Sequence, residues 1–362
     1  MKLTVKYNNK TVGYLAELKN GDVAFEYDKE WIRNGFSISP LSLPLTSKIY
    51  INKKNNFDGL YGVFWDSLPD GWGELLVRRM LNKLGIDFDS LSPLQRLSII
   101  SKNGLGALEY EPSKDLNPKI KEYDLDQLSE LSNEILNDNP SNDLDTIYNY
   151  GGSSGGARPK AHLTIDNEEW IVKFPCKMDP TNIGEKEYQA NKLAKKCGIN
   201  INECKLFKSN VCSGYFGAKR FDRNNGLKIH TISLCAILET SHRIPNLDYG
   251  YLFKVIQTIS NNKDDLYEAF KRMCFNVYYK NKDDHGKNFS FIYDEDTRTY
   301  RLSPAYDLTS TPYKFEHEMT INNNGNPCDE DLLTIAKDFK LSQEKCMKIM
   351  NEIKNKINLS TN

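Results

Sequence analysis

Short stretches of alternating apolar and polar residues open the chain. The alternation runs through residues 3–7 and again through residues 12–15, and Asn-Asn and Gly-Asp pairs separate such stretches. Because successive side chains of a strand point to opposite faces, this pattern predicts strands joined by tight turns. We therefore expect an antiparallel meander in the first fifty residues.

Helical periods appear in the next segments of the chain. Residues 74–84 carry leucine and methionine at helical spacing after the turn cluster Leu-Pro-Asp-Gly-Trp-Gly at 68–73, and they predict a helix. Glycines punctuate an apolar run at 104–110, which predicts a further strand. From 111 to 149 the composition shifts to Asp, Asn, Ser and Pro around one predicted helix at 125–136, so we place a domain junction there.

The second half of the chain changes from strands to helices. Residues 160–240 are predicted to form strands with one helix, and residues 248–359 to be mainly helical with an inserted hairpin. Apolar side chains recur at helical period between Leu266 and Tyr278, which predicts a buried helix. At about 150 residues per domain, a chain of 362 residues favours about two domains.

Composition and charge argue against several classes of protein. Hydrophobic residues make up 39% and aromatic residues 11% of the chain, unlike a disordered protein. The 48 basic and 49 acidic residues nearly cancel, unlike the basic balance of a dedicated nucleic-acid binder. No apolar run resembles a signal-peptide core or approaches the roughly 18 residues that span a bilayer, so we expect a cytosolic, cytoplasmic protein without a membrane partner. None of the eight cysteines forms a C-x-x-C pair, and we expect reduced thiols.

The strongest local signal is the glycine-rich segment at 150–160. It has the sequence Tyr-Gly-Gly-Ser-Ser-Gly-Gly-Ala-Arg-Pro-Lys. Its glycines leave backbone N–H groups unscreened, and Arg158 and Lys160 add positive charge, which suits an anion such as a nucleotide phosphate. The segment is not a Walker A loop, because no Lys followed by Ser or Thr closes it. A flexible linker at a domain junction is the alternative.

A lysine on a strand and a glutamate on the next helix add to this signal. Residues 169–175 predict a strand with Lys173 on the side opposite its large apolar residues, and residues 184–197 predict a helix on which Glu187 shares a stripe with small residues. In kinases such a pair fixes the lysine toward the ATP phosphates, although two surface charges are the alternative. Residues 217–223 predict a strand end whose backbone suits an adenine ring, or an ordinary strand end.

The decisive block follows the predicted buried helix. A polar loop at 281–288, Asn-Lys-Asp-Asp-His-Gly-Lys-Asn, leads into a predicted hairpin, and Ser-Pro-Ala-Tyr-Asp-Leu follows at 303–308. Phosphoryl transfer needs an Asp for the attacking hydroxyl, an Asn and a second Asp for Mg²⁺, and a Lys on the phosphates. Asp283 and Asn288 have the separation of the catalytic-loop Asp and Asn of protein kinases, and Asp307 stands where a D-F-G motif places its metal ligand.

Each of these residues also has a plain structural explanation. Asp283 can belong to a helix C-terminal turn and Asp307 to a turn that begins at proline, but the preserved order Gly loop, Lys, Glu, Asp, Asn, Asp favours a shared function. For His285 we expect a hydrogen bond that orients the loop, because the other histidines offer no metal-ligand spacing. A Ser-His-Asp hydrolase is disfavoured, since Gly-x-Ser-x-Gly is absent.

Together these motifs carry a family resemblance: nearly from end to end, the chain resembles the HipA family of bacterial serine/threonine kinases, the toxins of toxin–antitoxin pairs. The family implies an α+β, two-lobed protein-kinase-like fold, in which an α/β amino-terminal portion with antiparallel strands packs on a mainly α-helical carboxy-terminal lobe, with ATP and Mg²⁺ between them. Residues 40–45, 64–73 and 104–108 look like the amino-terminal region of the family, and residues 155–161, 283–290 and 303–308 look like its core motifs.

The resemblance implies three parts of the chain and a role for each candidate residue. Residues 1–125 would form the HipA amino-terminal subdomain, 126–240 an ATP-binding small lobe with the glycine-rich loop, and 241–362 a helical catalytic lobe. Asp283 would be the catalytic aspartate, and Asn288 and Asp307 would bind the metal. The implied ATP-binding residues are Ser153, Ser154, Gly155, Gly156, Ala157, Lys173, Glu187, Lys219, Phe221, His285, Lys287, Asn288 and Asp307.

The family also implies regulation and partners. A glycine-loop serine is its autophosphorylation site, and the modification inactivates the kinase by displacing the loop; Ser153 is the best match here and Ser154 is the neighbouring candidate. Family members act on aminoacyl-tRNA synthetases and so arrest translation. A small helix-turn-helix antitoxin of the HipB type restrains them, so that contact with DNA would pass only through the antitoxin.

This sequence departs from the family pattern in two ways. After Thr311 we predict little more than one helix, at 331–357, which would reduce part of the helical lobe or of the antitoxin-binding surface. The usual H-R-D and D-F-G motifs of protein kinases are absent as written. Two alternatives keep the ATP site: a pseudokinase-like module that binds nucleotide or antitoxin in DNA-bound repression, and a kinase of lipids or small molecules.

Overall fold

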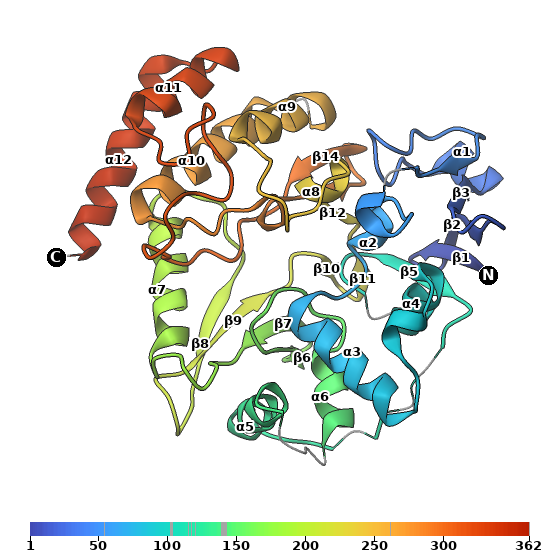
Figure 1. Cartoon of the computed structure of the whole chain (residues 1–362). Helices are drawn as coiled ribbons and strands as arrows, with labels where there is room; N and C mark the ends of the chain where they lie inside the picture. Colours follow the sequence, from blue (N-terminus) through green and yellow to red (C-terminus); the bar gives the residue numbers. More distant parts are fainter. Residues whose placement is uncertain are drawn as a thin grey trace. The chain divides into compact units, whose positions relative to one another are not determined.

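The amino-terminal residues form a five-stranded antiparallel sheet in the order β4-β3-β2-β1-β5. Strands β1, β2, β3 and β5 are labelled in Figure 1. The predicted meander is confirmed: β1 pairs with β2 across a turn at Asn8 and Asn9, whose φ angles of 45° and 67° suit a two-residue hairpin. Alternate residues of β1 are buried, so the sheet presents one face to a core. The strands are β1 (Lys2–Tyr7), β2 (Lys10–Glu17), β3 (Val23–Tyr27), β4 (Tyr50–Ile51) and β5 (Leu108–Glu111).

Helices fill the segments between these strands. Helix α3 begins at Gly71, three residues before its predicted start, and it buries Trp72, Leu76 and Met80. The strand predicted over 104–110 begins only at Leu108, because Gly106 has a φ of 72° and turns the chain before it pairs with β1. The helices are α1 (Lys29–Asn34), α2 (Gly62–Trp65), α3 (Gly71–Lys83) and α4 (Pro93–Ile100), with 3-10 turns at Asn55–Phe57 and Phe88–Ser90.

A second antiparallel sheet has the order β6-β7-β9-β8. Trp170 and Val172 of β7 are fully buried while Lys173 is half-buried, which confirms the predicted alternation. The predicted stripe on helix α7, which includes Glu187, is also buried. The elements are β6 (Lys160–Ile165), β7 (Glu168–Lys173), α7 (Ile183–Lys196), β8 (Cys204–Phe207) and β9 (Tyr215–Lys219), followed by the small hairpin of β10 (Arg223–Asn224) and β11 (Leu227–Lys228).

Two helices stand between the two sheets in the sequence. Helix α5 (Leu125–Leu136) has the predicted bounds, and a capping box between Asp124 and Gln127 begins it. Helix α6 (Leu144–Gly151) is not predicted, because the Asp-, Asn- and Ser-rich composition of this stretch is typical of loops. Ile147 of α6 belongs to the same buried core as Trp72 and Trp170, and this packing outweighs the weak local preference.

The carboxy-terminal half is mainly helical, with one small sheet of the order β12-β13-β14. Helix α10 is the predicted buried helix, and Phe270, Met273 and Cys274 on it have no exposed surface. The predicted hairpin is confirmed as β13 paired with β14. The elements are β12 (Thr231–Ser233), α8 (Leu234–Ile237), α9 (Tyr249–Ile259), α10 (Lys263–Tyr279), a 3-10 turn at Gly286–Asn288, β13 (Ser290–Asp294), β14 (Thr299–Leu302), α11 (Asp329–Asp338) and α12 (Gln343–Thr361).

The single helix predicted over 331–357 is wrong, because two helices, α11 and α12, occupy this region. The break lies at Lys340, whose left-handed φ of 55° ends α11. The hydroxyl of Ser342 then accepts the backbone N–H of Lys345 at 3.3 Å and begins α12. Leu341, which lies between α11 and α12 in the sequence, is buried like the apolar residues of both helices. The apolar pattern therefore continues across the break and gives no sign of it.

The chain divides into two compact units. Among the described residues, no helix combines the length and apolar character needed to cross a lipid bilayer. All eight cysteines are free thiols, as expected.

The domain boundaries predicted at 125 and 240 remain a prediction. Unit 1 comprises residues 1–185, 204–232 and 236–239, and unit 2 comprises residues 186–203, 233–235 and 240–362. The computed structural model describes residues 1–53, 55–101, 104–114, 116, 118–119, 121–138, 143–260 and 262–361.

His230 should make the stability of unit 1 depend on pH. Its buried ring donates from Nε2 to the carbonyl of Ile38 at 2.8 Å, and burial lowers its pKa from 6.5 to about 4. The unfolded chain binds this proton near pH 6.5 and the folded chain only near pH 4, so the free energy of unfolding should fall by up to about 3 kcal/mol as the pH falls through this window. We expect His230→Gln, which keeps an N–H donor, to flatten the profile in urea unfolding; an unchanged slope would contradict this.

Candidate active site

The glycine-rich segment ends helix α6 and leads into strand β6. Ser154 turns back on the helix, and its N–H and hydroxyl both donate to the carbonyl of Gly151, at 2.9 and 2.5 Å. Ser154 is fully buried, whereas Ser153 is half-buried, with its Oγ 3.4 Å from Nδ1 of His162. Gly156 has a φ of 78°, which L side chains rarely adopt. Of the two candidate serines, Ser153 therefore has the more accessible hydroxyl.

Two lysines stand opposite each other on the strands that follow this segment. Lys160 of β6 and Lys173 of β7 are direct cross-strand partners. Nζ of Lys173 lies 5.7 Å from the centre of the Phe216 ring on β9, and Lys160 donates to the carbonyl of Gly155. Two positive charges at this spacing repel each other and favour an anionic group beside them. The pair therefore adds positive charge next to the glycine-rich segment.

A buried polar cluster lies behind Ser153. Nε and Nη2 of Arg220 donate to the two carboxylate oxygens of Asp222, at 2.8 and 2.7 Å, and Nη1 lies 3.3 Å from Nδ1 of His162. Burial, and then the charge of Arg220, lower the pKa of His162 well below 6.5, so its ring is neutral at pH 7. Because Arg220 donates to Nδ1, the ring proton is on Nε2. Ser153 therefore faces an acceptor nitrogen and not a cation.

The other predicted nucleotide contacts of unit 1 lie at the end of β9. Lys219 is ion-paired with Glu168 at the start of β7. Phe221 follows in a turn and is half-buried. The backbone role predicted for this strand end remains a prediction.

In unit 2, the predicted catalytic loop begins where α10 ends. Lys280 takes a left-handed φ of 57° and closes the helix. At the end of the loop, residues Gly286–Asn288 form a single 3-10 turn. Nδ2 of Asn288 donates to the backbone carbonyl of Asp283 at 2.9 Å. This bond links the last residue of the loop to the backbone of Asp283 and orients the Asn288 amide.

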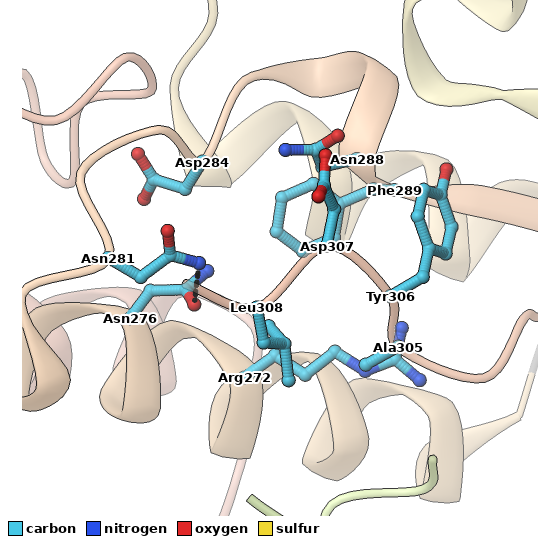
Figure 2. Close-up of a pocket in the computed structure, with 10 residues that line it drawn as sticks. All are labelled: Arg272, Asn276, Asn281, Asp284, Asn288, Phe289, Ala305, Tyr306, Asp307 and Leu308. Atoms are coloured by element: carbon cyan, nitrogen blue, oxygen red, sulfur yellow. Dashed lines mark hydrogen bonds between the residues drawn. The ribbon is translucent and has the colours of Figure 1, made fainter. Parts of the chain in front are cut away.

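Asn288 and Asp307 line one pocket of unit 2 (Figure 2). Asp307 has a φ of 57°, a conformation uncommon outside glycine and enriched for Asp and Asn. Both side chains offer oxygen donors, which suit Mg²⁺, an ion that usually takes one or two protein ligands beside phosphate and water oxygens. Within the described ranges, no group of three His, Cys, Asp or Glu side chains is arranged to hold a metal. The pocket is lined by Arg272, Asn276, Asn281, Asp284, Asn288, Phe289, Ala305, Tyr306, Asp307 and Leu308.

A lysine that the sequence does not single out contacts Asp283. Nζ of Lys314 lies 2.5 Å from Oδ1 of Asp283 and 2.7 Å from Oε1 of Glu318. Its segment is held against the loop, because the backbone N–H of Lys282 donates to the Thr311 hydroxyl at 2.8 Å. The side chain of Asp283 remains 41% exposed. The i,i+4 spacing of Lys314 and Glu318 is visible in the sequence, but it predicts only their own pairing.

Asp284 has a different environment from its neighbour. Its carboxylate is fully buried and accepts three hydrogen bonds, from the Tyr249 hydroxyl and His317 Nδ1, both at 2.8 Å, and from the Glu318 N–H at 3.1 Å. Burial, and then the charge of Asp284, raise the pKa of Tyr249 well above 10, so this hydroxyl remains a donor. Asn276 of α10 donates to the same hydroxyl oxygen at 2.9 Å. Asp284 thus anchors the loop on which Asp283 stands exposed.

A buried arginine holds the segment that ends at Asp307. Arg272 of α10 pairs with Glu268 at 3.0 Å and donates to the carbonyl of Ser303 at 2.6 Å. The Tyr306 hydroxyl donates to the carbonyl of Lys287 at 2.7 Å. These bonds join α10, the predicted catalytic loop and the segment before Asp307 into one connected framework. The framework sets how Asn288 and Asp307 are placed in the pocket.

The orienting hydrogen bond predicted for His285 is not made. Its Nδ1 is buried without a partner in the part of the chain that the structure describes, and its ring lies beside His242, with centroids 5.4 Å apart. His317 makes the orienting bond instead, through Asp284. No local pattern could indicate this, because the two residues are far apart in the sequence.

The predicted nucleotide residues divide between the two units. Within unit 1 the glycine-rich segment precedes the strand pair that carries Lys173. Within unit 2 the predicted catalytic loop and Asp307 share one framework, and Glu187 is buried on α7. The ion pair predicted between Lys173 and Glu187 remains a prediction.

Two family models match the chain. The model of the HipA-like C-terminal domain matches residues 152–360, and the model of the HipA N-terminal domain matches residues 3–111. The chain belongs to the HipA family. This confirms the resemblance drawn from the motifs, and the first match contains the predicted catalytic loop, Asp307 and most of the glycine-rich segment.

Individual relatives extend the comparison. The chain is 31% identical over 169 residues to "Putative kinase Y4dM" of Sinorhizobium fredii, covering 42% of this chain and 41% of that protein, so the match spans less than half of the relative. It is 23% identical to "Putative kinase Y4mE" of the same species over 343 residues, 85% of this chain and 77% of that protein. HipA of Shewanella oneidensis MR-1, solved with HipB and operator DNA, is 20% identical to this chain, with a TM-score of 0.71. The match covers 97% of this chain and 88% of the Shewanella chain. This likeness confirms the predicted HipA-like α+β fold.

Proposed function

We propose that this HipA-family protein is an ATP-dependent serine/threonine protein kinase. The observation that carries the proposal lies in unit 2, where Asn288 and Asp307 line one pocket and Asn288 holds the backbone of Asp283. An Asp, an Asn and a second Asp in this order are the residues that protein kinases use for phosphoryl transfer. The family, and relatives named as kinases, support the same activity.

In this proposal Asp283 orients the acceptor hydroxyl of a protein Ser or Thr. The hydroxyl approaches Oδ2, because Lys314 contacts Oδ1. As the hydroxyl oxygen bonds to the γ-phosphorus, the bond to the ADP oxygen breaks, and Asp283 accepts the hydroxyl proton. The 41% exposure of Asp283 leaves room for a protein segment to approach.

Asn288 and Asp307 fit a magnesium site completed by the nucleotide. Mg²⁺, when bound, neutralises the charge on the phosphate oxygens. The Asn288 amide oxygen and the Asp307 carboxylate would hold it, and the bond from Asn288 to Asp283 would place the metal ligand and the catalytic residue in a fixed relation. Lys173 and the glycine-rich segment would bind the phosphates.

Autophosphorylation at Ser153 is part of the proposal. The Ser153 hydroxyl is half-buried and faces the neutral ring of His162. Ser154 is the poorer acceptor, because it is buried and its hydroxyl already donates to the Gly151 carbonyl.

Transfer of labelled phosphate from ATP tests the proposed function. With Mg-ATP, the purified protein should label itself on Ser153 and at least one protein of a bacterial lysate, and EDTA should abolish both. Phosphosite mapping in the lysate also tests the acceptor that the family resemblance implies, an aminoacyl-tRNA synthetase. ATP binding without any transfer would support the pseudokinase alternative. Labelling of lipids or small molecules alone would support the other alternative, a kinase of lipids or small molecules.

Lys314→Met should slow transfer without weakening ATP binding. Lys314 holds the carboxylate of Asp283, and a misplaced carboxylate no longer orients the hydroxyl. We expect kcat to fall roughly 10- to 100-fold, with the KM for ATP within about twofold, and Lys314→Arg to recover part of the loss. The control is Lys282→Met, which removes a nearby ammonium that donates to the carbonyl of Phe315. Equal losses in both methionine variants would contradict this role.

We also propose a HipB-type antitoxin as partner, with DNA contacted only through it. The support is the fold shared with the HipA chain of Shewanella oneidensis, which was solved with HipB and operator DNA. Co-purification with a helix-turn-helix protein encoded beside this chain tests the idea. Recovery of the native protein without any such partner would contradict it.

A further inference from the structure

The start of helix α3 contacts the glycine-rich segment through both backbone groups of one residue. The N–H of Gly156 donates to a carboxylate oxygen of Asp70, and the carbonyl of Gly156 accepts the N–H of Trp72 at 2.9 Å. Asp70 occupies the N-cap position of α3, where an aspartate usually binds the first turn of its own helix. Its side chain makes no such cap bond here. Its carboxylate instead accepts the hydrogen bond from Gly156 in the glycine-rich segment.

Two glycines allow this close approach. A Cβ at Gly73 would overlap the carbonyl oxygen of Ser154, and a Cβ at Gly71 would lie 2.6 Å from the carbonyl oxygen of Gly156. Gly71 also has a φ of 47°, which strains other residues. The sequence Asp-Gly-Trp-Gly at 70–73 is therefore shaped to lie against residues 154–156.

Trp72 reaches both ends of the same segment. Its side chain is 1% exposed, and its Nε1 donates to the carbonyl of Lys160 at 3.1 Å. At the other end, a Cβ on Gly151 would lie 2.7 Å from the same Nε1. One indole thus contacts the residues at which the segment leaves α6 and enters β6.

A segment this rich in glycine and serine has no conformational preference of its own. Residues 70–73 fix the conformation of the segment, because they contact its middle at Gly156 and its two ends at Gly151 and Lys160. We infer that these residues, with Asp70 as the positioning side chain, pre-organise the glycine-rich segment for nucleotide phosphates. The inference rests on the proposed kinase function for its ligand, and it gives the amino-terminal region a direct part in the nucleotide site.

Three variants separate this role from general stability. Asp70→Ala removes the acceptor for Gly156, Asp70→Asn keeps an oxygen there, and Glu74→Ala breaks only a surface pair with Arg78 in the first turn of the same helix. Hydrogen exchange over residues 151–160 reports the segment directly, and the KM for ATP and kcat report its consequence. Because Asp70 makes no cap bond, Asp70→Ala should fold.

The expected result is selective. Asp70→Ala should speed amide exchange in residues 151–160 by about tenfold and raise the KM for ATP by a similar factor, with kcat changed less than about threefold. Asp70→Asn and Glu74→Ala should behave as the wild type. Unchanged exchange in Asp70→Ala, or equal effects in Asp70→Ala and Glu74→Ala, would overturn the inference. A wild-type protein that fails to bind ATP would overturn the proposed function instead, while the exchange data would still decide whether residues 70–73 order the segment.

Discussion

Asp283→Asn should abolish most phosphate transfer and leave the fold unchanged. The substitution keeps the shape of the side chain but removes the carboxylate that, in the proposed function, accepts the hydroxyl proton, so kcat should fall by about 10²- to 10⁴-fold. Its effect on stability should stay within about 1 kcal/mol, because Asp283 is 41% exposed and its pairing with Lys314 is near the surface. Initial rates with Mg-ATP and a urea unfolding curve on the same preparation measure both quantities.

The matched control for this variant is Asp296→Asn. Asp296 is an exposed acidic residue in the turn of the hairpin that follows the loop, so it loses the same charge without touching the proposed site. It should transfer phosphate at the wild-type rate. If Asp283→Asn were as active as Asp296→Asn, Asp283 would have no part in the chemistry.

Asp284→Ala should have the opposite profile and destabilise the protein strongly. Removing this buried carboxylate leaves the donors on Tyr249, His317 and Glu318 without their acceptor in a water-excluded region. We expect the free energy of unfolding to fall by about 3–5 kcal/mol, and activity to fall with it because the loop loses its anchor. Urea unfolding monitored by circular dichroism measures this.

Tyr249→Phe provides a graded comparison for Asp284. It removes one of the three donors to the carboxylate and also the acceptor of the buried Asn276 amide, so we expect a loss of about 1–3 kcal/mol, less than in Asp284→Ala. Wild-type stability in Asp284→Ala would show that the network does not hold the loop.

Local patterns predict much of this fold. Helix α5 has its predicted bounds because a capping box begins it and its apolar period is regular. The β13–β14 hairpin and the alternation of β7 follow from spacing alone. The order of the glycine-rich segment, a lysine, a glutamate, Asp283, Asn288 and Asp307 predicts a shared function, and the motif segments around these residues carry the resemblance to the HipA family that the family models confirm.

The features that local patterns miss depend on contacts between distant residues. Lys314 and His317 reach Asp283 and Asp284 from a segment about thirty positions further along the chain, and nothing near them in the sequence indicates this. Helix α6 forms because Ile147 completes a core with residues of both neighbouring segments. Asp70 looks like a helix cap, and only the structure shows that it binds Gly156 instead.

The left-handed backbone at Asp307 restricts evolution at this position. Glycine, asparagine and aspartate tolerate a φ of 57° most easily, whereas β-branched residues do not. Only two of these three carry a side-chain oxygen, and only aspartate adds a full negative charge. A saturation library selected for folding alone would therefore retain a few residue types. A second selection for phosphate transfer, the proposed activity, would reduce that short set almost to one.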